Sequence, residues 1–412
     1  MLNILWAAFL LIAMATALIK TVFLGDVIVL PAMGAALFES AKTGFEIALG
    51  LTGVMSLWLG ILKIGEAAGL IQLLARFLAP LFRRLLPEVP AGHPALGSIT
   101  MNIAANMLGL DNAATPLGLK AMADLQTLNP TPDTASNAQI LFLVINTASV
   151  TLFPVTILAY RAQLGAANPA DVFIPLLIAS YVATLAGIAF TGMIQRLRLW
   201  DPVVLAYLLG LSTLVAGAST WFLSLPAAQM SVQSALISNA LLLGIVSLFL
   251  LAGLIKRIPV YEVFIEGAKE GFHTAIRIVP YLVAMLLAIA LLRASGALDA
   301  LLGALRSGVA LGGWDTRWID GVPTGILKTL SGSGARATML ETLKTQGADS
   351  FAGRLVSILQ GSSETTFYVL AVYFGSVGIR RTRHAVACGL FADLIGFIAA
   401  VAVTYAFFGA VN

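Results

Sequence analysis

Length, composition and charge indicate a membrane protein and argue against several other classes. The chain has 412 residues, of which 59% are hydrophobic and only 11% are charged, and its mean hydropathy is +0.94. A soluble domain carries about 25% charged residues, so we predict an all-α polytopic membrane protein. The formal net charge of +4 comes without a basic run interleaved with aromatics, so nothing favours a nucleic-acid partner. One Cys and three dispersed His residues lack metal-ligand spacing, and we expect neither a metal nor a cofactor.

Seven apolar segments are long enough, or nearly so, to cross about 30 Å of hydrocarbon. The first, 2–19, is followed by Lys20, and Ala15-Thr16-Ala17 within it resembles a signal-peptidase site. No Lys or Arg precedes this apolar run, so we expect a first helix that is retained. The other candidate spans are 47–62, 172–194, 203–225, 235–255, 278–292 and 385–408.

Residues 70–86 predict an amphipathic helix rather than a span. Apolar residues recur at helical spacing along one stripe, whereas Gln72, Arg76 and Arg83 fall on the opposite face. The members of the stripe are Leu70, Leu74, Phe77, Leu78, Leu81 and Leu85. Such a helix lies at the membrane interface or on the cytoplasmic surface of the protein.

Four polar stretches interrupt the apolar pattern, at 102–115, 146–151, 330–338 and 360–366. The last is the strongest, because this polar segment separates two apolar runs that are each too short to cross a bilayer. Unpaired backbone at membrane depth is tolerated only against protein or a water-filled cavity. The pattern therefore predicts broken or re-entrant helices around a polar site near the centre of the membrane.

Local signals predict where helices restart after these breaks. Thr115-Pro116 suits an N-cap followed by a first helical residue. The glycines at 332 and 334 disfavour helix and predict a restart near Ala335. The Ser362-Ser363 pair offers a cap for another start, with Glu364 in its first turn. Each start would direct free N–H groups and a partial positive charge at the polar site.

We expect the four breaks to converge and bind a small polar solute. Helix N-termini favour anionic groups, and hydroxyl and amide side chains supply donors and acceptors. For any single Ser or Thr, hydrogen bonding between packed helices is the plainer explanation. The candidate substrate-binding residues are Asn102, Asn106, Asp111, Asn112, Thr115, Asn146, Thr147, Ser149, Thr151, Ser331, Gly332, Ser333, Gly334, Arg336, Gln360, Ser362, Ser363, Glu364, Thr365 and Thr366.

Three carboxylates are candidates for proton or ion coupling: Asp111, Glu364 and Asp393. Carboxylates inside membrane segments are rare without a function. Glu364 has pairing with Arg336 as its alternative role, and a helix N-terminus would stabilise its anionic form. Asp393 lies within the last apolar segment, where it serves either as a second relay or as an ion-pair partner of a neighbouring Arg.

Weak internal matches indicate that the chain is built twice. Four of them occur in the same order in both copies: 41–45 with 268–272, 68–69 with 295–296, 114–117 with 337–340, and 146–160 with 360–374. Each match is weak by itself, but their collinear order is not expected by chance. The copies are expected to span about 38–160 and 264–374.

Charge bias predicts that the two copies have opposite orientations. The pairs Arg196/Arg198 and Lys256/Arg257 flank two adjacent spans, which places both loops in the cytoplasm by the positive-inside rule. Arg380, Arg381 and Arg383 then lie inside, whereas the matching loop 162–171 lies outside. Matching loops of opposite bias are typical of inverted-topology repeats. We expect the N-terminus inside and the C-terminus outside, in a bacterial inner membrane.

Three motifs resemble those of the spore maturation proteins A and B. NMLGLDNAATPLGLKAM at 106–122 is similar to the signature of protein A, and LSGSGAR at 330–336 and QGSSETTFYVLAVYF at 360–374 are similar to protein B. The chain thus resembles a fusion of an A-like half, 1–198, and a B-like half, 199–412. Both halves resemble the nucleoside-recognition gate repeats also found in concentrative nucleoside transporters and ferrous iron permeases. The resemblance implies inverted repeats with broken helices and a homo-oligomer, dimeric or trimeric.

These observations favour a secondary transporter of a small anionic or zwitterionic organic solute, such as a nucleoside-like or carboxylated metabolite, coupled to H+ or Na+. One alternative is a non-transporting membrane scaffold in envelope or spore-type maturation, whose polar breaks would be fully self-satisfied and enclose no cavity. A metal-ion permease is disfavoured, because the motifs offer Ser, Thr and Asn where ferrous iron prefers softer or imidazole ligands. An intramembrane enzyme would need a nucleophile–base pair that the sequence does not contain.

Overall fold

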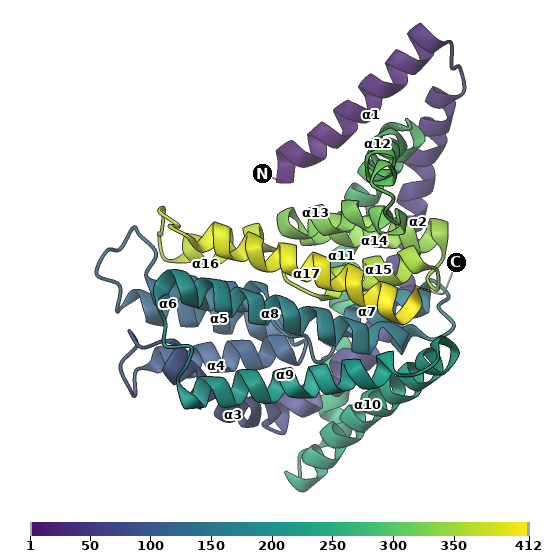
Figure 1. Cartoon of the computed structure of the whole chain (residues 1–412). Coiled ribbons are helices and arrows are strands. Elements are labelled where there is room, and N and C mark those ends of the chain that lie inside the picture. The colour runs from purple at the N-terminus through teal and green to yellow at the C-terminus, as the bar shows by residue number, and fades with distance from the viewer. Residues whose placement is uncertain (1, 410–412) are drawn as a thin grey trace.

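The computed structural model shows a helical bundle in which no strand occurs between residues 2 and 409 (Figure 1). It describes the backbone of this range and its side chains, except those of residues 2, 3, 5, 111–113, 223, 227, 228, 230, 231 and 277. The all-α prediction is confirmed. Seven of the described helices are long and apolar enough to cross a membrane, which agrees with a multi-pass membrane protein.

The first part of the chain forms eight α-helices and one 3-10 turn. They are α1 (Leu2–Leu24), α2 (Val29–Ala67), α3 (Leu70–Leu85), α4 (Pro94–Met107), α5 (Asp111–Gln126), α6 (Asn137–Thr147), α7 (Val155–Gln163), η1 (Pro169–Val172) and α8 (Phe173–Gln195). Helix α9 (Pro202–Leu223) follows and connects this part of the chain to the second part.

The second part of the chain has long and short helices in the same order as the first part. Its elements are α10 (Ala227–Ile255), α11 (Val260–Ala294), α12 (Ala297–Leu311), η2 (Arg317–Gly321), α13 (Val322–Leu330), α14 (Gly332–Gln346), α15 (Phe351–Gly361), α16 (Thr366–Ser376) and α17 (Ala385–Phe408). In both parts a very long helix precedes a medium one, a helical hairpin, two short helices and a final long helix. The predicted spans 47–62 and 278–292 prove to be segments of the 39-residue α2 and the 35-residue α11.

The long helices α2 and α11 pack closely along their length, because glycines remove side chains from their contact. A Cβ added at Gly271 would lie 2.5 Å from the carbonyl oxygen of Met55, and one added at Gly60 would lie 2.6 Å from the Phe264 ring. Gly267 and Gly271 form a small-xxx-small pattern on α11, which allows membrane helices to approach at backbone distance. This pair of helices forms the central support of the fold.

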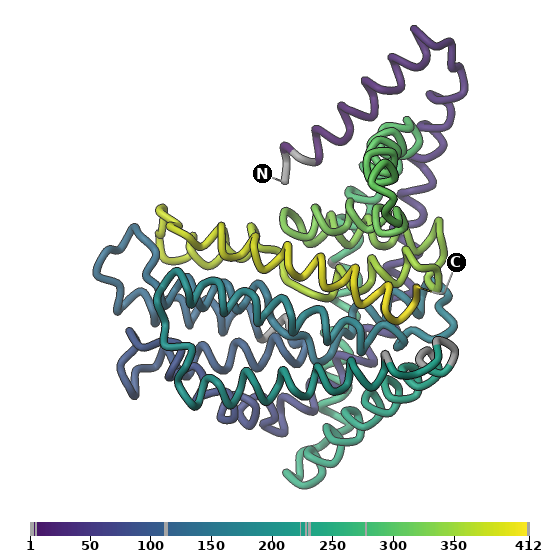
Figure 2. The backbone as a smooth tube through the Cα atoms, in the orientation of Figure 1, coloured from purple at the N-terminus to yellow at the C-terminus, as the bar shows by residue number. Residues whose placement is uncertain are grey.

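A second close contact joins α8 to α17, which run side by side in the backbone trace (Figure 2). Small residues again form it: a Cβ at Gly396 would lie 3.0 Å from the Ala183 Cβ, and one at Gly187 would lie 3.2 Å from the Ala392 Cβ. By contrast, α1, α9 and α10 leave most of their apolar side chains exposed or only half-buried. Figure 1 shows α1 and α10 projecting from the body, where lipid would cover such surfaces.

The predicted amphipathic helix is confirmed as α3, but its buried face is rotated from the predicted stripe. Ile71, Ala75 and Phe82 are buried, whereas Phe77 is 63% exposed and Leu70 only half-buried. The predicted polar residues Gln72, Arg76 and Arg83 are exposed as expected. A wide apolar stripe can be buried along either of its edges. Helices α4 and α9 pack against α3 and determine which edge is buried.

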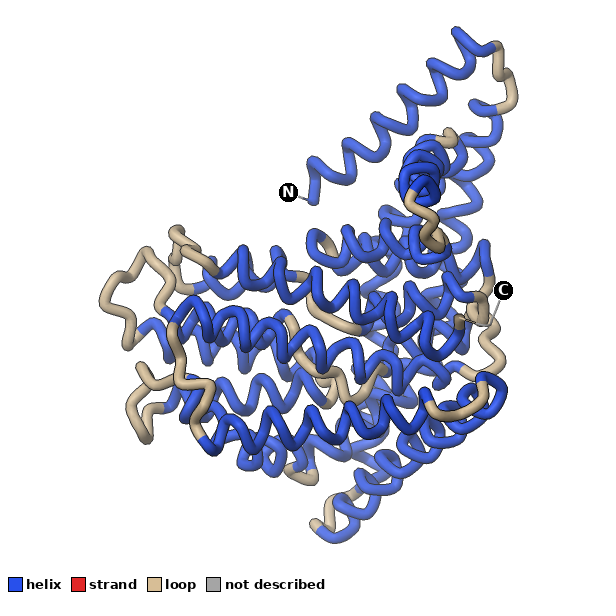
Figure 3. The backbone as a smooth tube through the Cα atoms, in the orientation of Figure 1, coloured by secondary structure: helices blue, strands red, loops and turns tan. Residues whose placement is uncertain are grey.

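Loops gather at two opposite ends of the bundle (Figure 3). At one end, the α5–α6 loop pairs with the α16–α17 loop through the bridge of Thr134 with Arg381. At the other end, the α7–α8 connection contacts the α14–α15 loop, where Arg161 lies 2.7 Å from Asp171 and 3.2 Å from Asp349. Figure 3 also shows tan segments inside the bundle, away from both ends. These interior breaks form the candidate site.

Candidate functional site

Each part of the chain supplies one helical hairpin and one broken helix to the interior. The hairpins are α4–α5, turned at 108–110, and α13–α14, turned at Ser331. The broken helices are α6–α7, unwound over 148–154, and α15–α16, unwound over 362–365. The four predicted polar stretches thus coincide with the four interior breaks in helical structure.

The two unwound segments bind each other through main-chain hydrogen bonds. The Glu364 N–H donates to the Thr147 carbonyl oxygen at 2.6 Å, and the Thr151 hydroxyl donates to the Gly361 carbonyl oxygen at 3.2 Å. Segments more than 200 residues apart therefore satisfy part of each other's exposed backbone. This pairing meets the requirement that unwound backbone inside a membrane be held by protein.

Each hairpin tip packs onto an unwound segment through a glycine. A Cβ at Gly109 would lie 2.5 Å from the Phe153 carbonyl oxygen, and one at Gly332 would lie 2.9 Å from the Thr365 hydroxyl oxygen. Gly109 also has a φ of +71°, a conformation that side chains disfavour. These glycines let the tips reach the same central point.

A cavity of about 120 Å³ lies where the four breaks meet. Eight predicted site residues line it: Asn106, Thr151, Gly332, Arg336, Gln360, Ser363, Glu364 and Thr365. Helices α7, α14 and α16 all begin at this cavity or beside it. Their N-termini add partial positive charge to its wall.

Ten other predicted residues do not line the cavity, and some of them support its walls. Among them, Asn102 donates to the Ala114 carbonyl oxygen at 2.7 Å and accepts from Asn146 at 2.5 Å. These bonds fix the α4–α5 hairpin against α6. The ten are Asn102, Thr115, Asn146, Thr147, Ser149, Ser331, Ser333, Gly334, Ser362 and Thr366. The side chains of Asp111 and Asn112 lie outside the described residues.

The predicted helix starts are wrong by a few residues. Helix α5 begins at Asp111, so Pro116 lies inside it; proline near a helix start removes few bonds, because the first N–H groups have no intrahelical partner. Helix α14 begins at Gly332, with Ser331 as its N-cap through a 3.1 Å bond from the Gly334 N–H. Tertiary contacts outweigh the local cost of these glycines.

The predicted start after Ser362-Ser363 is also wrong. Helix α16 begins at Thr366, so Glu364 belongs to the unwound segment and not to a first turn. The Ser362 hydroxyl donates back to the Leu359 carbonyl oxygen at 3.1 Å instead of capping α16. Pairing of the Glu364 N–H with Thr147 holds this segment away from helical geometry.

Two cations and one anion face the central cavity. Arg336 lies over the Tyr160 ring, with its guanidinium carbon 5.8 Å from the ring centroid, and it shares the cavity with Lys328 and Glu364. Lys328 was missed by the sequence analysis, although a single cation in the apolar run of α13 was a usable signal. Its side chain is only 7% exposed.

Asp393 on α17 lies behind the cavity wall. The Thr366 hydroxyl donates to its Oδ2 atom at 2.6 Å, while its Oδ1 atom has no protein partner among the described residues. Ser363 and Lys328, which line the cavity, also interact with this carboxylate. The relay role stays a prediction, and the cation near this carboxylate is Lys328 rather than an Arg.

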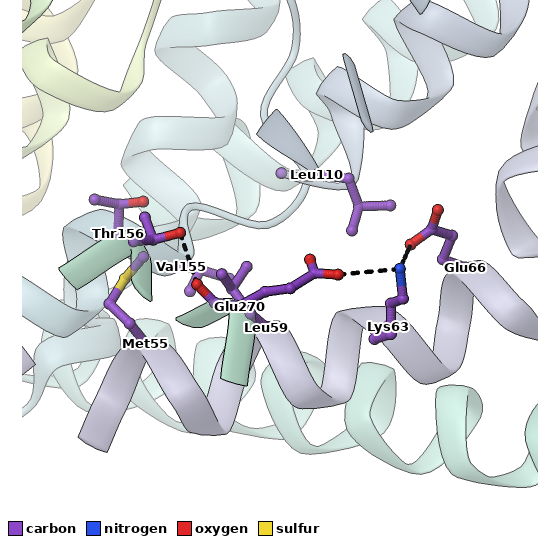
Figure 4. A pocket seen from close by; sticks show the side chains of 10 residues that line it. Met55, Leu59, Lys63, Glu66, Leu110, Val155, Thr156 and Glu270 are labelled. Carbon is purple, nitrogen blue, oxygen red and sulfur yellow. Dashed lines mark hydrogen bonds and ion pairs between the residues drawn. The ribbon is translucent and has the colours of Figure 1, made fainter. Parts of the chain in front are cut away.

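A second cavity of about 60 Å³ adjoins the first and shares Gly109, Val155 and Thr156 with it. Figure 4 shows Lys63 of α2 between two carboxylates at its far end. The Lys63 ammonium lies 3.4 Å from Glu66 and 3.3 Å from Glu270 of α11. This charged group joins α2 to α11, and the sequence analysis did not place it at the site.

Several buried polar atoms around the central cavity have no protein hydrogen-bond partner in the described structure. They are Thr147 Oγ1, Ser149 Oγ, Tyr160 Oη, Gln360 Oε1 and Asp393 Oδ1. An unpaired buried donor or acceptor costs about 1–3 kcal/mol. Of these residues, Gln360 lines the cavity, where its amide oxygen can accept a hydrogen bond from a polar solute or water. Among the described residues, no group of three or more His, Cys, Asp or Glu side chains could hold a metal ion.

Comparisons with known proteins agree with the motifs. A family model for nucleoside recognition, called Gate, matches residues 48–164 and 275–380. Spore maturation protein B of Bacillus subtilis is 43% identical over 173 residues, which cover 42% of this chain and 96% of that protein. Spore maturation protein A of the same organism is 37% identical over 188 residues, covering 46% of this chain and 92% of that protein. No solved structure matches the chain.

Proposed function

The chain belongs to the Gate family of nucleoside-recognition proteins, and from this premise we propose that it is a secondary membrane transporter. Its substrate would be a small polar organic solute, anionic or zwitterionic, bound in the central cavity. The observation that carries this proposal is the convergence of four interior helix breaks on one polar cavity. Discontinuous helices that meet inside the bundle are typical of transporter binding sites.

The charges around the cavity support the proposed solute class. Lys328 and Arg336 provide two full positive charges, and the adjoining helix N-termini add partial ones. Glu364 provides a negative charge in the same cavity. A carboxylated metabolite would pair with the cations, and a zwitterion would pair with both signs. A nucleoside-like solute would use the hydroxyl and amide groups of Thr151, Ser363 and Gln360.

The order of elements supports inverted-topology repeats, with about 38–160 and 264–374 as their cores. The series α1–α8 and α10–α17 correspond element by element, and α9 lies between them. If each series crosses the membrane an even number of times, the single crossing by α9 inverts the second series. The halves 1–198 and 199–412 would then be related by a two-fold axis in the membrane plane.

The cavity around Lys63 supplies a route from the central cavity towards one face of the protein. It shares the lining residues Gly109, Val155 and Thr156 with the central cavity, and its charged end lies near the last turn of α2. We propose that the solute passes this group, in a step coupled to H+ or Na+. By the positive-inside rule we expect this face in the cytoplasm, with the N-terminus inside and the C-terminus outside.

The scaffold alternative predicts polar breaks that are fully self-satisfied and no cavity. The cavity and the unpaired atoms around it weigh against that reading. A metal-ion permease is weakened by the nature of the lining groups, which are mainly hydroxyls, amides and cations. Transport therefore remains the function that the site supports best.

Uptake into proteoliposomes tests the proposal. Arg336→Ala and Glu364→Gln should each reduce uptake of the solute at least tenfold, a loss of about 1.4 kcal/mol in binding. Arg380→Ala and Glu262→Gln are matched controls, because both side chains are exposed and distant from the cavity. Unchanged uptake in both site variants would refute the assignment of the site.

A further inference from the structure

We propose that a second, separate site at the junction of α3, α6, α8 and α9 binds the phosphate of an anionic phospholipid headgroup. The site, called here the α3/α9 hollow, has a volume of about 390 Å³. Six charged residues line it: Arg83, Arg84, Glu88, Arg196, Arg198 and Asp201. It shares no lining residue with the two cavities of the transport site.

The α3/α9 hollow has an excess of positive charge, because four arginines line it against two carboxylates. Glu88 accepts a hydrogen bond from the Asn137 amide at 2.8 Å. Asp201 caps α9 by accepting from the Val203 N–H at 2.9 Å, and it lies 3.6 Å from Arg84. No ion pair within the described structure neutralises the other three arginines, Arg83, Arg196 and Arg198.

Arginine chemistry points to phosphate as the anion. The guanidinium is planar and always charged, and its paired N–H groups match two oxygens of a phosphate at once. Arg83 is in the last turn of α3, and Arg196 and Arg198 follow α8. Arginines from two separate elements can therefore approach one phosphate group from different sides.

The surroundings of the α3/α9 hollow favour a lipid over a soluble phosphate. Helix α3 exposes Leu73 and Phe77, each 63% accessible, and Trp200 between α8 and α9 is 85% exposed. Tryptophan and an amphipathic helix are typical of the boundary between headgroups and acyl chains. The ring of Phe77 also contacts Tyr207 of α9 at 5.3 Å between centroids. Apolar surface for acyl chains thus lies beside the basic hollow.

A basic pocket between membrane helices is an arrangement that binds anionic lipid headgroups. A lipid held there would join α3 to the α8–α9 connection, which otherwise meet through the pair of Arg84 with Asp201. It would therefore stabilise the packing of α3 against the α8–α9 connection.

Thermal unfolding of the purified, delipidated full chain in detergent tests the proposal. We expect short-chain phosphatidylglycerol to raise Tm, and short-chain phosphatidylcholine and inorganic phosphate to leave it unchanged. The shift should be lost in R196Q/R198Q. The matched control is K256Q/R257Q, which removes the same charge at another helix end; Arg196 and Arg257 share a φ of 54°.

Three outcomes would overturn the proposal: an equal shift with phosphatidylcholine, an undiminished shift in R196Q/R198Q, or no shift with phosphatidylglycerol. An equal shift with inorganic phosphate would replace the lipid by a soluble anion and so overturn the lipid assignment. If R196Q/R198Q does not fold, Arg83→Gln replaces it, because this exposed side chain on α3 makes no ion pair among the described residues. The thermal-unfolding assay does not measure solute uptake. A result that refutes the lipid site therefore leaves the transport proposal untouched.

Discussion

Replacing Arg161 by Met should destabilise the protein strongly, because this guanidinium is fully buried and bonded to several separate groups. Its Nη2 atom donates to Asp171 at 2.7 Å and to Asp349 at 3.2 Å. Its Nη1 atom donates to the Ala348 carbonyl oxygen at 2.7 Å, and Nε donates to the Pro169 carbonyl oxygen at 3.2 Å. The substitution removes the bonds that Arg161 makes between the α7–α8 connection and the α14–α15 loop, and leaves the bond from the Ala167 N–H to Asp349 at 2.8 Å.

The size of the effect follows from what remains after Arg161 is removed. Asp171 keeps its 2.8 Å contact with Arg354, so it is left half-paired, while two carbonyl oxygens lose a donor. Removing one partner of a buried charge network costs about 3–5 kcal/mol. Arg381→Met is the matched control, since Arg381 is 76% exposed and lies 3.8 Å from Asp133. An exposed pair of this kind contributes at most about 1 kcal/mol.

The assay is equilibrium unfolding of both variants in mixed micelles with increasing sodium dodecyl sulfate. We expect Arg161→Met to lower the free energy of unfolding by several kcal/mol more than Arg381→Met. Equal losses in the two variants would refute the reasoning, because they would mean that the buried network contributes no more than a surface pair.

Three further predictions follow from other contacts. Gly271→Ala should destabilise the protein by about 1–3 kcal/mol, since the new Cβ meets the Met55 backbone. The control Gly303→Ala should not destabilise it, because a Cβ there has nothing within 4 Å. Equal losses of stability in an unfolding titration would contradict this. Asn102→Leu should cost a similar 1–3 kcal/mol by leaving buried partners unpaired, as the same titration measures. Burial lowers the pKa of His384, and the neighbouring Arg383 contributes to the shift. The folded state therefore favours the neutral imidazole. In an unfolding titration, wild type should lose more stability than His384→Gln as pH falls below about 6.5.

Much of the architecture was predictable because composition and periodicity act locally. Seven apolar segments predicted the long helices, and the polar segment at 360–366 predicted the break between α15 and α16. The helix boundaries were less predictable, because tertiary contacts override local signals. Glu364 is held out of helix by the carbonyl oxygen of Thr147, more than 200 residues earlier, and no local pattern contains that information.

The division of the candidate site into lining and supporting residues could not be read from the sequence. Asn102 and Asn106 lie one helical turn apart, yet Asn106 lines the cavity while Asn102 bonds to Ala114 and Asn146. Lys328 was overlooked because its short apolar helix was not recognised as one arm of a hairpin. The Lys63 group was overlooked because Glu270 reaches it only through the packing of α2 against α11.

The central claim is that the cavity at the four helix breaks binds a small polar solute. The most direct measurement is thermal stabilisation of the purified protein against a metabolite library, in sodium and sodium-free buffer at two pH values. A ligand at about a hundred times its dissociation constant adds about 2.7 kcal/mol of stability. The account predicts at least one anionic or zwitterionic ligand whose effect is lost in Arg336→Ala and Glu364→Gln. Stabilisation that persists unchanged in both variants, or the absence of any stabilising ligand, would contradict it.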